Sequence, residues 1–420
     1  MPDSPSNRPT ITLAHTVERT RFGSFRFIVL LGLLDAFGPL GIDMYLPGFP
    51  AIGRALSASP GAMQWTLSAF LAGLAVGQLI CGPISDRVGR RRPLLVGSAL
   101  FAVACATCAF ARSFEAFLLA RFVMGLAGAT GMVVARAIVR DSFEESESSR
   151  VYSMLMLVIG VAPVLAPTMG GWLISLGGWG LIFWALGAFA LTCGLAVAID
   201  LPETLPADRR VSDPIGSVFG RYAAIAVDRM FLAQAAPVGL ALAIILAYVA
   251  SAPSLFLETF ALSPQAFSRI FAVNAIGLIG SAQLNRWLVR RYPTRAILRV
   301  ALLANAAISL SLPILAWTGL GGVVGFTIAI FLCLSTLGIV LPNATAAAMA
   351  PFAEQAGTAS ALLGASQFAL GAFAGWVVGV FHDGTPLPMA LTIGACGAIS
   401  LAITLAADRR PGHVPATAAP

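Results

Sequence analysis

Long apolar runs separated by short polar stretches cover most of the chain. Each run holds about 20 residues, the length of helix that crosses the roughly 30 Å hydrocarbon core of a bilayer. Because only a helix satisfies all of its own backbone hydrogen bonds in lipid, each run is predicted to be a transmembrane helix. We identify twelve such runs, near 27–48, 62–84, 93–111, 114–138, 151–176, 178–200, 230–251, 266–288, 296–318, 322–346, 357–381 and 387–407.

The longest polar connection, 201–229, lies near the middle of the chain and separates the runs into two groups of six. The polar exit of the eighth run, from Ser281 to Arg291, weakly repeats the exit of the second run about 200 residues earlier, and internal repeats are typical of secondary transporters. We therefore expect an all-α membrane protein with 12 transmembrane helices. Its predicted parts are a cytoplasmic N-terminal arm (1–26), a six-helix bundle (27–200), a cytoplasmic linker (201–229), a second six-helix bundle (230–407) and a cytoplasmic tail (408–420).

Arginine is distributed unevenly between the predicted connections. All 26 basic residues are arginine, and with a cytoplasmic N-terminus only Arg54, Arg112 and Arg269 fall in outer connections. Cytoplasmic connections carry most of the basic residues in membrane proteins. This bias supports an even number of spans, with both termini on the cytoplasmic side of the membrane. It also accounts for the net charge of +7 without a nucleic-acid partner.

The composition narrows the classes of function. Hydrophobic residues make up 58% of the chain and charged residues 11%, whereas a soluble domain carries about 25% charged residues, so a soluble enzyme is excluded. The three histidines lie at 15, 382 and 413, in the arm, an outer connection and the tail, so none can serve a buried centre. The G-x-x-x-x-G-K phosphate-binding loop of an ATP-driven pump is also absent. We expect no enzyme activity, no metal and no cofactor.

Two carboxyl groups, those of Asp35 and Asp43, lie within the first apolar run. An ionisable side chain inside a membrane is costly to bury, so it is a functional candidate unless it is paired. The two are about 12 Å apart along a helix, and Gly38, Pro39 and Gly41 between them are expected to bend the helix so that both face one cavity. The alternative for Asp43 is a helix-end residue at the outer interface.

Arg121 lies within the fourth run, at a depth similar to that of Asp43. We hypothesise that it is the electrostatic partner of Asp43, which holds the carboxylate charged when close and allows its protonation when apart. A purely structural ion pair is the alternative. Arg136 and Arg140 fall near the inner headgroups, where long basic side chains reach outward to the polar surface.

Several motifs resemble those of the major facilitator superfamily. The exit of the second run matches its G-x-x-x-D-R-x-G-R-R signature at Gly82, Asp86, Arg87, Gly89, Arg90 and Arg91. The segment 121–125 resembles its arginine motif, although Met124 stands where glutamine is common. The fifth run resembles the motif of the drug:proton antiporters at Pro163, Pro167, Gly170 and Gly171, residues that suit a hinge or a close helix contact. The segments 42–47 and 134–141 resemble the bicyclomycin/chloramphenicol-resistance (Bcr/CflA) branch.

The resemblance implies alternating access by two bundles around a central cavity. It also implies export of small amphiphilic, drug-like compounds such as antibiotics, driven by a proton gradient, in a lipid-embedded monomer. Proton and substrate coupling would reside on Asp35, Asp43 and Arg121. The acid of the signature motif would lock a cytoplasmic gate formed with Arg90 and Asp141, and a charge cluster that breaks and re-forms suits a bistable gate.

Polar side chains in other runs are candidates to line the cavity, and the alternative for each is a hydrogen bond between helices. These residues are Tyr45, Gln64, Asn274, Asn343 and Gln367. A proton-coupled metabolite transporter of the same superfamily is the alternative function.

Overall fold

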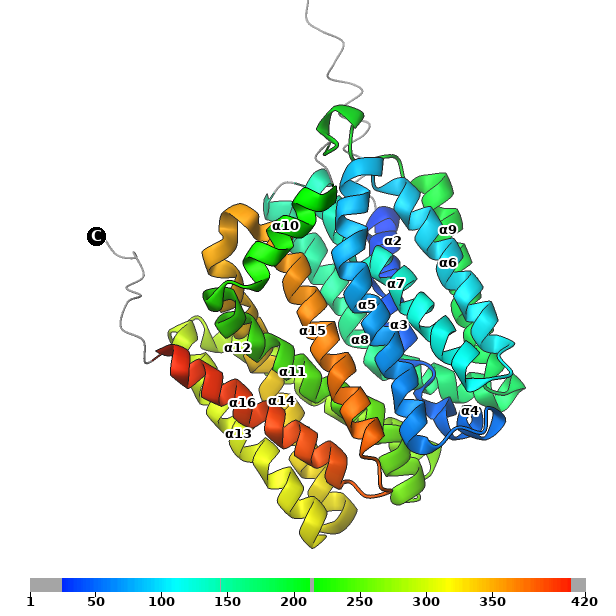
Figure 1. Ribbon diagram of the computed structural model, residues 1–420, viewed down its shortest axis with the longest axis vertical. Coiled ribbons are helices and arrows are strands. Elements are labelled where there is room, and N and C mark those ends of the chain that lie inside the picture. Colours follow the sequence, from blue (N-terminus) through cyan, green and yellow to red (C-terminus); the bar gives the residue numbers. More distant parts are fainter. Residues whose placement is uncertain (1–24, 144, 212–214, 409–420) are drawn as a thin grey trace, which may run out of the picture.

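The computed structural model describes residues 25–143, 145–211 and 215–408, and all regular structure in these residues is helical (Figure 1). The first half holds α2 (Phe25–Asp35), α3 (Phe37–Asp43), η1 (Leu46–Gly48), α4 (Phe49–Ala55), α5 (Pro60–Val88), α6 (Arg91–Ala109), α7 (Phe114–Ser142), α8 (Glu145–Gly177) and α9 (Gly180–Asp200). The linker holds η2 (Ala207–Arg209) and α10 (Ile215–Ala226). The second half holds α11 (Arg229–Pro253), η3 (Ser254–Thr259), α12 (Pro264–Leu288), α13 (Thr294–Thr318), α14 (Gly322–Met349), η4 (Ala350–Gln355), α15 (Ala356–Val380) and α16 (Leu387–Asp408).

Most of these helices are long and apolar enough to cross a membrane. In the described ranges ten qualify, or up to eleven if a bent pair at the start of the chain counts as one span, and α8 contributes a shorter apolar segment, Val161–Gly177. Large apolar side chains such as Val300, Trp317 and Val324 are exposed on the outside of the helices. An apolar exterior of this kind is suited to contact with lipid.

The first predicted span is broken into α2 and α3. The segments Phe25–Asp35 and Phe37–Ala55 are bent by 44° relative to each other. The sequence predicts a bend at the glycines and proline between the two aspartates, and the break falls at Ala36, slightly earlier. Pro39 has no amide hydrogen, so it cannot bond to the carbonyl four residues before it, that of Asp35. The helix therefore opens one turn before the proline, next to the first aspartate.

The helices pack in two groups, α2–α9 and α11–α16, which lie side by side in Figure 1. Within the first group, α5 and α7 make the most extensive contact, because Gly73 and Gly125 let the two backbones meet; a Cβ atom at either position would overlap the backbone of the facing helix. The two groups meet mainly where α5 packs against α15 and where α8 packs against α12.

The linker contains a helix that the sequence reading treats only as a polar connection. Tyr222 and Ile225 of α10 are three residues apart and both buried, the spacing of one helix face. The helix contacts α11 and α15 of the second group. The linker is therefore packed onto the second group rather than passing freely between the two.

Candidate functional site

Asp35 lies at the end of α2 and is fully buried. The nearest cation is Arg136 on α7, whose Nη2 lies 3.7 Å from Asp35 Oδ1, and neither carboxylate oxygen accepts a hydrogen bond from the described residues. The expectation that Arg136 reaches the inner headgroups is incomplete, because its side chain pairs with this carboxylate and is 43% exposed. A buried carboxylate with one loosely held cation is poised to exchange a proton or a ligand.

Asp43 lies at the last residue of α3 and is also buried. In the described part of the chain its carboxyl group forms neither a hydrogen bond nor an ion pair. Tyr248 of α11, in the other group of helices, lies close enough to feel the charge of the Asp43 carboxylate. Asp35 thus lies against α7 and Asp43 lies toward α11, and the common cavity for both aspartates stays a prediction.

Arg121 on α7 is fully buried between two aromatic rings. Its guanidinium carbon lies 3.9 Å from the ring centre of Tyr45 and 4.4 Å from that of Phe70, distances at which a cation is attracted to the ring face. Its Nη2 also donates a 2.9 Å hydrogen bond to the carbonyl oxygen of Gly41. Tyr45 is in turn fixed by a 3.2 Å hydrogen bond between its hydroxyl and that of Thr66.

The predicted ion pair between Arg121 and Asp43 is absent from the described residues. Gly41 lies in the last turn of α3, where carbonyl oxygens lack partners inside the helix and the helix dipole is negative. The guanidinium binds this helix end, two residues before Asp43. Arg121 therefore fixes the backbone that carries Asp43 and leaves its carboxyl group free.

A second charged cluster surrounds Arg90, which lies between the C-terminal end of α5 and the start of α6. Its Nη1 donates to Asp86 Oδ1 (2.5 Å) and to the hydroxyl of Ser85 (2.8 Å), and its Nε donates to Asp141 Oδ2 (2.8 Å). The Arg90 side chain is 2% exposed. The structure thus brings together the three residues of the predicted cytoplasmic gate, from α5, the turn before α6, and α7.

Glu203, in the linker after α9, belongs to this cluster and was missed by the sequence reading. Its carboxylate accepts hydrogen bonds from the backbone amides of Arg90 (2.7 Å) and Arg91 (3.3 Å), which begin α6. A carboxylate at a helix N-terminus satisfies free amide groups and the positive end of the helix dipole. Gly89 makes this approach possible, since its φ of 94° favours glycine and a Cβ atom there would overlap the Glu203 carboxylate.

The other residues of the signature motif differ in their surroundings. Arg91 Nη2 donates a 2.5 Å hydrogen bond to the carbonyl of Ala198 on α9. Arg87 also has a partner among the described residues, through a polar, ionic or ring contact. A Cβ atom at Gly82 would meet only ordinary contact, 3.7 Å from Val133, so close packing does not explain this glycine.

We predict that Arg90→Ala destabilises the protein by about 2 kcal/mol, because two carboxylates lose the cation between them. The estimate lies below the value for a fully buried pair because Asp86 is 38% exposed and Asp141 16%, so solvent screens them. Thermal unfolding of the purified protein in detergent measures the change. Arg92→Ala removes an exposed arginine that directly follows the motif and serves as the control; equal midpoints for the two variants would show that the cluster adds no stability.

The proline and glycine motif lies in α8. Pro163 and Pro167 are both inside this helix, which runs unbroken from Glu145 to Gly177. A Cβ atom at Gly170 would overlap the backbone of Met44, whereas one at Gly171 would meet nothing. Gly170 therefore lets α8 pack directly against the turn that follows Asp43. A movement of α8 would displace that turn.

The predicted cavity-lining residues occupy different surroundings. Tyr45 is fully buried inside the first group, and Gln367 is partly buried on α15. Asn274 Nδ2 donates to the hydroxyl of Tyr248 (2.7 Å), and Asn343 Nδ2 donates to Asn285 Oδ1 (2.7 Å). The Asn343 bond joins α14 to α12, the alternative that the sequence left open for it. Gln64 crosses between the groups, with its Nε2 3.4 Å from the hydroxyl of Ser254.

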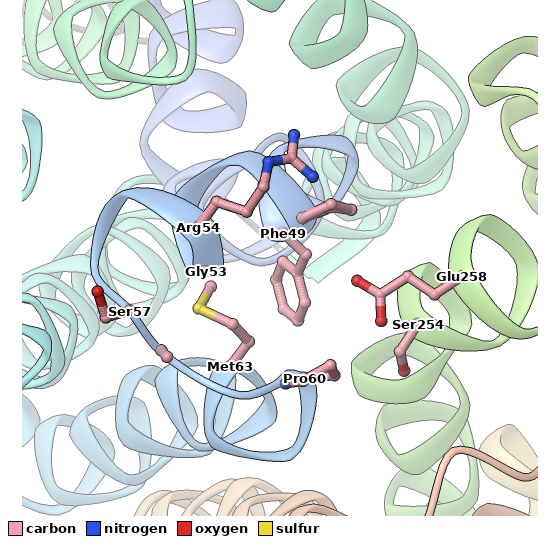
Figure 2. Close-up of a pocket in the computed structure, with 10 residues that line it drawn as sticks. Phe49, Gly53, Arg54, Ser57, Pro60, Met63, Ser254 and Glu258 are labelled. Atoms are coloured by element: carbon pink, nitrogen blue, oxygen red, sulfur yellow. The ribbon is translucent and has the colours of Figure 1, made fainter.

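A cavity of about 280 Å³ lies between the two groups near α4 (Figure 2). Phe49, Arg54 and Met63 line it from the first group, and Ser254 and Glu258 line it from η3. Figure 2 shows Glu258 extending into the cavity from the side opposite α4. In the described ranges no three His, Cys, Asp or Glu side chains gather as metal ligands would.

Comparisons with known proteins cover nearly the whole chain. A family model described as "Major Facilitator Superfamily" matches residues 31–376. The chain is 37% identical over 366 residues to the "Uncharacterized MFS-type transporter YdgK" of Bacillus subtilis, covering 86% of this chain and 90% of that protein. It is 30% identical over 378 residues to the "Bicyclomycin resistance protein homolog" of Haemophilus influenzae, covering 90% and 95%.

The fold also matches solved transporter structures. The xylose transporter XylE from E. coli, in a partially occluded inward open conformation, superimposes with a TM-score of 0.69 and 13% sequence identity. The match covers 90% of this chain and 97% of that one. At this identity the likeness concerns the arrangement of helices alone.

Proposed function

The chain belongs to the major facilitator superfamily, and we propose that it exports small amphiphilic, drug-like compounds in exchange for protons. The observation that carries the proposal is Asp43, a buried carboxyl group without a partner in the described residues, placed where the first group of helices faces α11. A carboxylate in such a site is costly while charged, so it binds either a proton or a polar group of a substrate. That competition is the chemical basis of exchange.

The apolar helices make the chain a multi-pass protein of the bacterial inner membrane. The proposed export of antibiotics draws on the name of the Haemophilus relative and on the motifs shared with the Bcr/CflA branch. The name of the Bacillus relative describes a transporter and does not specify its substrate. The proton gradient is the proposed energy source, since buried carboxyl groups are available to carry protons.

We also propose the finer architecture. It has twelve spans in two six-helix bundles, 27–200 and 230–407, joined by the linker 201–229, with the arm 1–26 and the tail 408–420 in the cytoplasm. The asymmetric distribution of arginine supports this topology. The monomer is the proposed working unit, because both bundles and the site between them belong to one chain.

In the proposed cycle, a proton from outside neutralises Asp43, and the neutral site allows the bundles to reorient toward the cytoplasm. A substrate then enters, and the proton leaves to the cytoplasm as the substrate takes its place near the carboxylate. The cluster around Arg90 opens and closes the cytoplasmic side, because it can exist either with its hydrogen bonds made or with them broken. Arg121 holds the end of α3 in place throughout.

A susceptibility panel tests the direction and the substrate class. Efflux-deficient bacteria expressing the chain should tolerate higher concentrations of phenicol or cationic compounds, such as chloramphenicol or ethidium, than cells with an empty vector, because export lowers the concentration inside. Inhibitory concentrations are compared at matched expression. Unchanged susceptibility across a broad panel would contradict drug export and favour the metabolite transporter of the same superfamily.

A further inference from the structure

A line of hydroxyl groups follows the outer half of α11 into η3. Tyr248, Ser251 and Ser254 are buried and spaced three residues apart, so they lie on one side of the helix. The Ser251 hydroxyl donates to the carbonyl of Ala247 (2.7 Å), and that of Ser254 donates to the carbonyl of Ser251 (3.0 Å). Each serine oxygen therefore keeps a lone pair to accept a hydrogen bond.

A narrow crevice of about 10 Å³ lies beside this line, between the two groups of helices. That volume is close to the smallest space that holds one water molecule, and a stable water also needs at least two polar partners. Gln64, Ser251, Ser254 and His382 are among the polar side chains that line it. The Oε1 atom of Gln64 is buried, has no hydrogen-bond partner in the described residues, and belongs to a side chain with no exposed surface. The crevice therefore has the polar lining that a bridging water requires.

His382 stands at the outer end of the crevice, just beyond α15. Burial lowers the pKa of its imidazole, and the charge of the adjacent Asp383 opposes this shift. The imidazole is therefore neutral at pH 7, with one nitrogen that donates and one that accepts. Sequence reasoning set this histidine aside because it lies in an outer connection.

Asp43 lies near the inner end of the line. The hydroxyl of Tyr248 accepts the 2.7 Å bond from Asn274, so its own proton is free to be donated elsewhere. Asp43 interacts electrostatically with Tyr248, and η1, three residues beyond Asp43, contacts α11. The Oδ1 atom of Asn274 is buried and has no partner in the described residues. Polar groups thus extend from the outer connection to the carboxyl group of Asp43.

We propose that this line, from His382 through Gln64, Ser254 and Ser251 to Tyr248, is the route by which protons from the outside reach Asp43. The inference rests on the proposed function, because it supplies the proton that drives export. A hydronium ion at the outer surface gives a proton to the crevice water. Each hydroxyl or water along the route accepts one proton on a lone pair and releases its own to the next group. Gln64 and His382 line the crevice, hold its water by hydrogen bonds and do not carry the proton, which passes over water and hydroxyl oxygens. The last proton binds to the Asp43 carboxylate, so only O–H bonds are made and broken.

The test is the rate at which Asp43 is modified by dicyclohexylcarbodiimide, which reacts with protonated carboxyl groups in apolar surroundings. The full chain is placed in liposomes with the outer face outside, the inner pH is held constant, and the outer pH is lowered. Fragmentation of the peptide containing Asp35 and Asp43 identifies the modified residue. This readout requires no knowledge of the transported compound.

In the wild type, lowering the outer pH should accelerate labelling of Asp43. In Gln64→Leu and in Ser254→Ala, the rise in labelling after the outer pH is lowered should develop about tenfold more slowly. This is the change expected for the loss of one hydrogen bond from the route. Gln78→Leu makes the same substitution on the same helix, away from the crevice, and should behave as the wild type. Labelling at equilibrium in detergent should be equal in all four proteins, which separates access of the proton from affinity for it.

Wild-type labelling kinetics in both crevice variants would overturn the route and leave the exchange of protons for drugs standing. If the rate of labelling of Asp43 in the wild type does not change with the pH on either side, proton coupling at this residue is overturned, and the route with it. Proton-driven export of ethidium or chloramphenicol, measured in the same liposomes, distinguishes these two failures.

Discussion

Asp43→Asn abolishes gradient-driven export while the protein still folds and enters the membrane. Asparagine has nearly the same shape as aspartic acid, and no cation among the described residues pairs with Asp43 and would lose its partner in the change. An amide cannot take up and release a proton, so exchange loses its carrier. We expect the export rate to fall at least about 100-fold, the usual contribution of a positioned proton-transfer group.

Efflux of ethidium and resistance to chloramphenicol, measured in cells at matched membrane levels, report the loss. Asp208→Asn makes the same substitution at an exposed linker position and should leave both values unchanged. Wild-type efflux by Asp43→Asn would remove this residue from the coupling mechanism and transfer the role to Asp35, the other buried carboxyl group of the first span.

Arg121→Ala has the second largest expected effect. The guanidinium stacks between Tyr45 and Phe70 and bonds to the carbonyl of Gly41, so its removal releases the end of α3 and leaves a buried carbonyl without its donor. A displacement of about 1 Å at a reacting group can cost about 100-fold in rate, and we expect a loss of that order in efflux. Arg121 acts through the position of Asp43 and does not itself carry the proton.

Arg121→Lys separates charge from geometry. Lysine retains the positive charge but lacks the planar guanidinium that spans two rings and a carbonyl, so it should restore only part of the efflux rate. Arg112→Ala removes an exposed arginine between α6 and α7 and should transport normally. Full activity in Arg121→Lys would show that charge alone matters. Full activity in Arg121→Ala would contradict the positioning role altogether.

The apolar pattern predicts the helices well because their length is imposed by the membrane. The predicted run 322–346 corresponds to α14 (Gly322–Met349), and 357–381 corresponds to α15 (Ala356–Val380). The observed helices are often longer, as for α5, where 62–84 becomes Pro60–Val88. The hydropathy pattern locates only the part of a helix that lies in lipid. The ends of the helix continue into polar sequence, which the pattern does not count as part of the span.

The partners of the buried charges were harder to predict, because depth along a helix does not say which way a side chain faces. Arg121 and Asp43 have similar predicted depths, yet Arg121 binds the C-terminal end of α3, which is open because the helix ends at Asp43. Arg136 pairs with Asp35 because both face the interface of α2 and α7. Sequence spacing on one helix contains no information about these contacts.

Two further residues, Glu203 and Tyr248, make contacts that the sequence analysis did not predict. Glu203 reaches the start of α6 across more than a hundred positions, and only the fold shows that Gly89 leaves room for it. A signal was nevertheless present, since an acid just after an apolar run lies on the same predicted side of the membrane as the arginine cluster. Tyr248 carries no such signal, because a tyrosine in an apolar run is usually a packing residue.

The most direct test of the account is chloramphenicol and ethidium transport by purified protein in liposomes with an imposed pH gradient. The wild type should accumulate at least one of them against its concentration gradient when protons move in the opposite direction. Asp43→Asn should lose this accumulation but still exchange labelled for unlabelled compound when no gradient is applied, because binding and reorientation remain. Accumulation by Asp43→Asn at the wild-type level would contradict the claim that this carboxyl group couples proton entry to export.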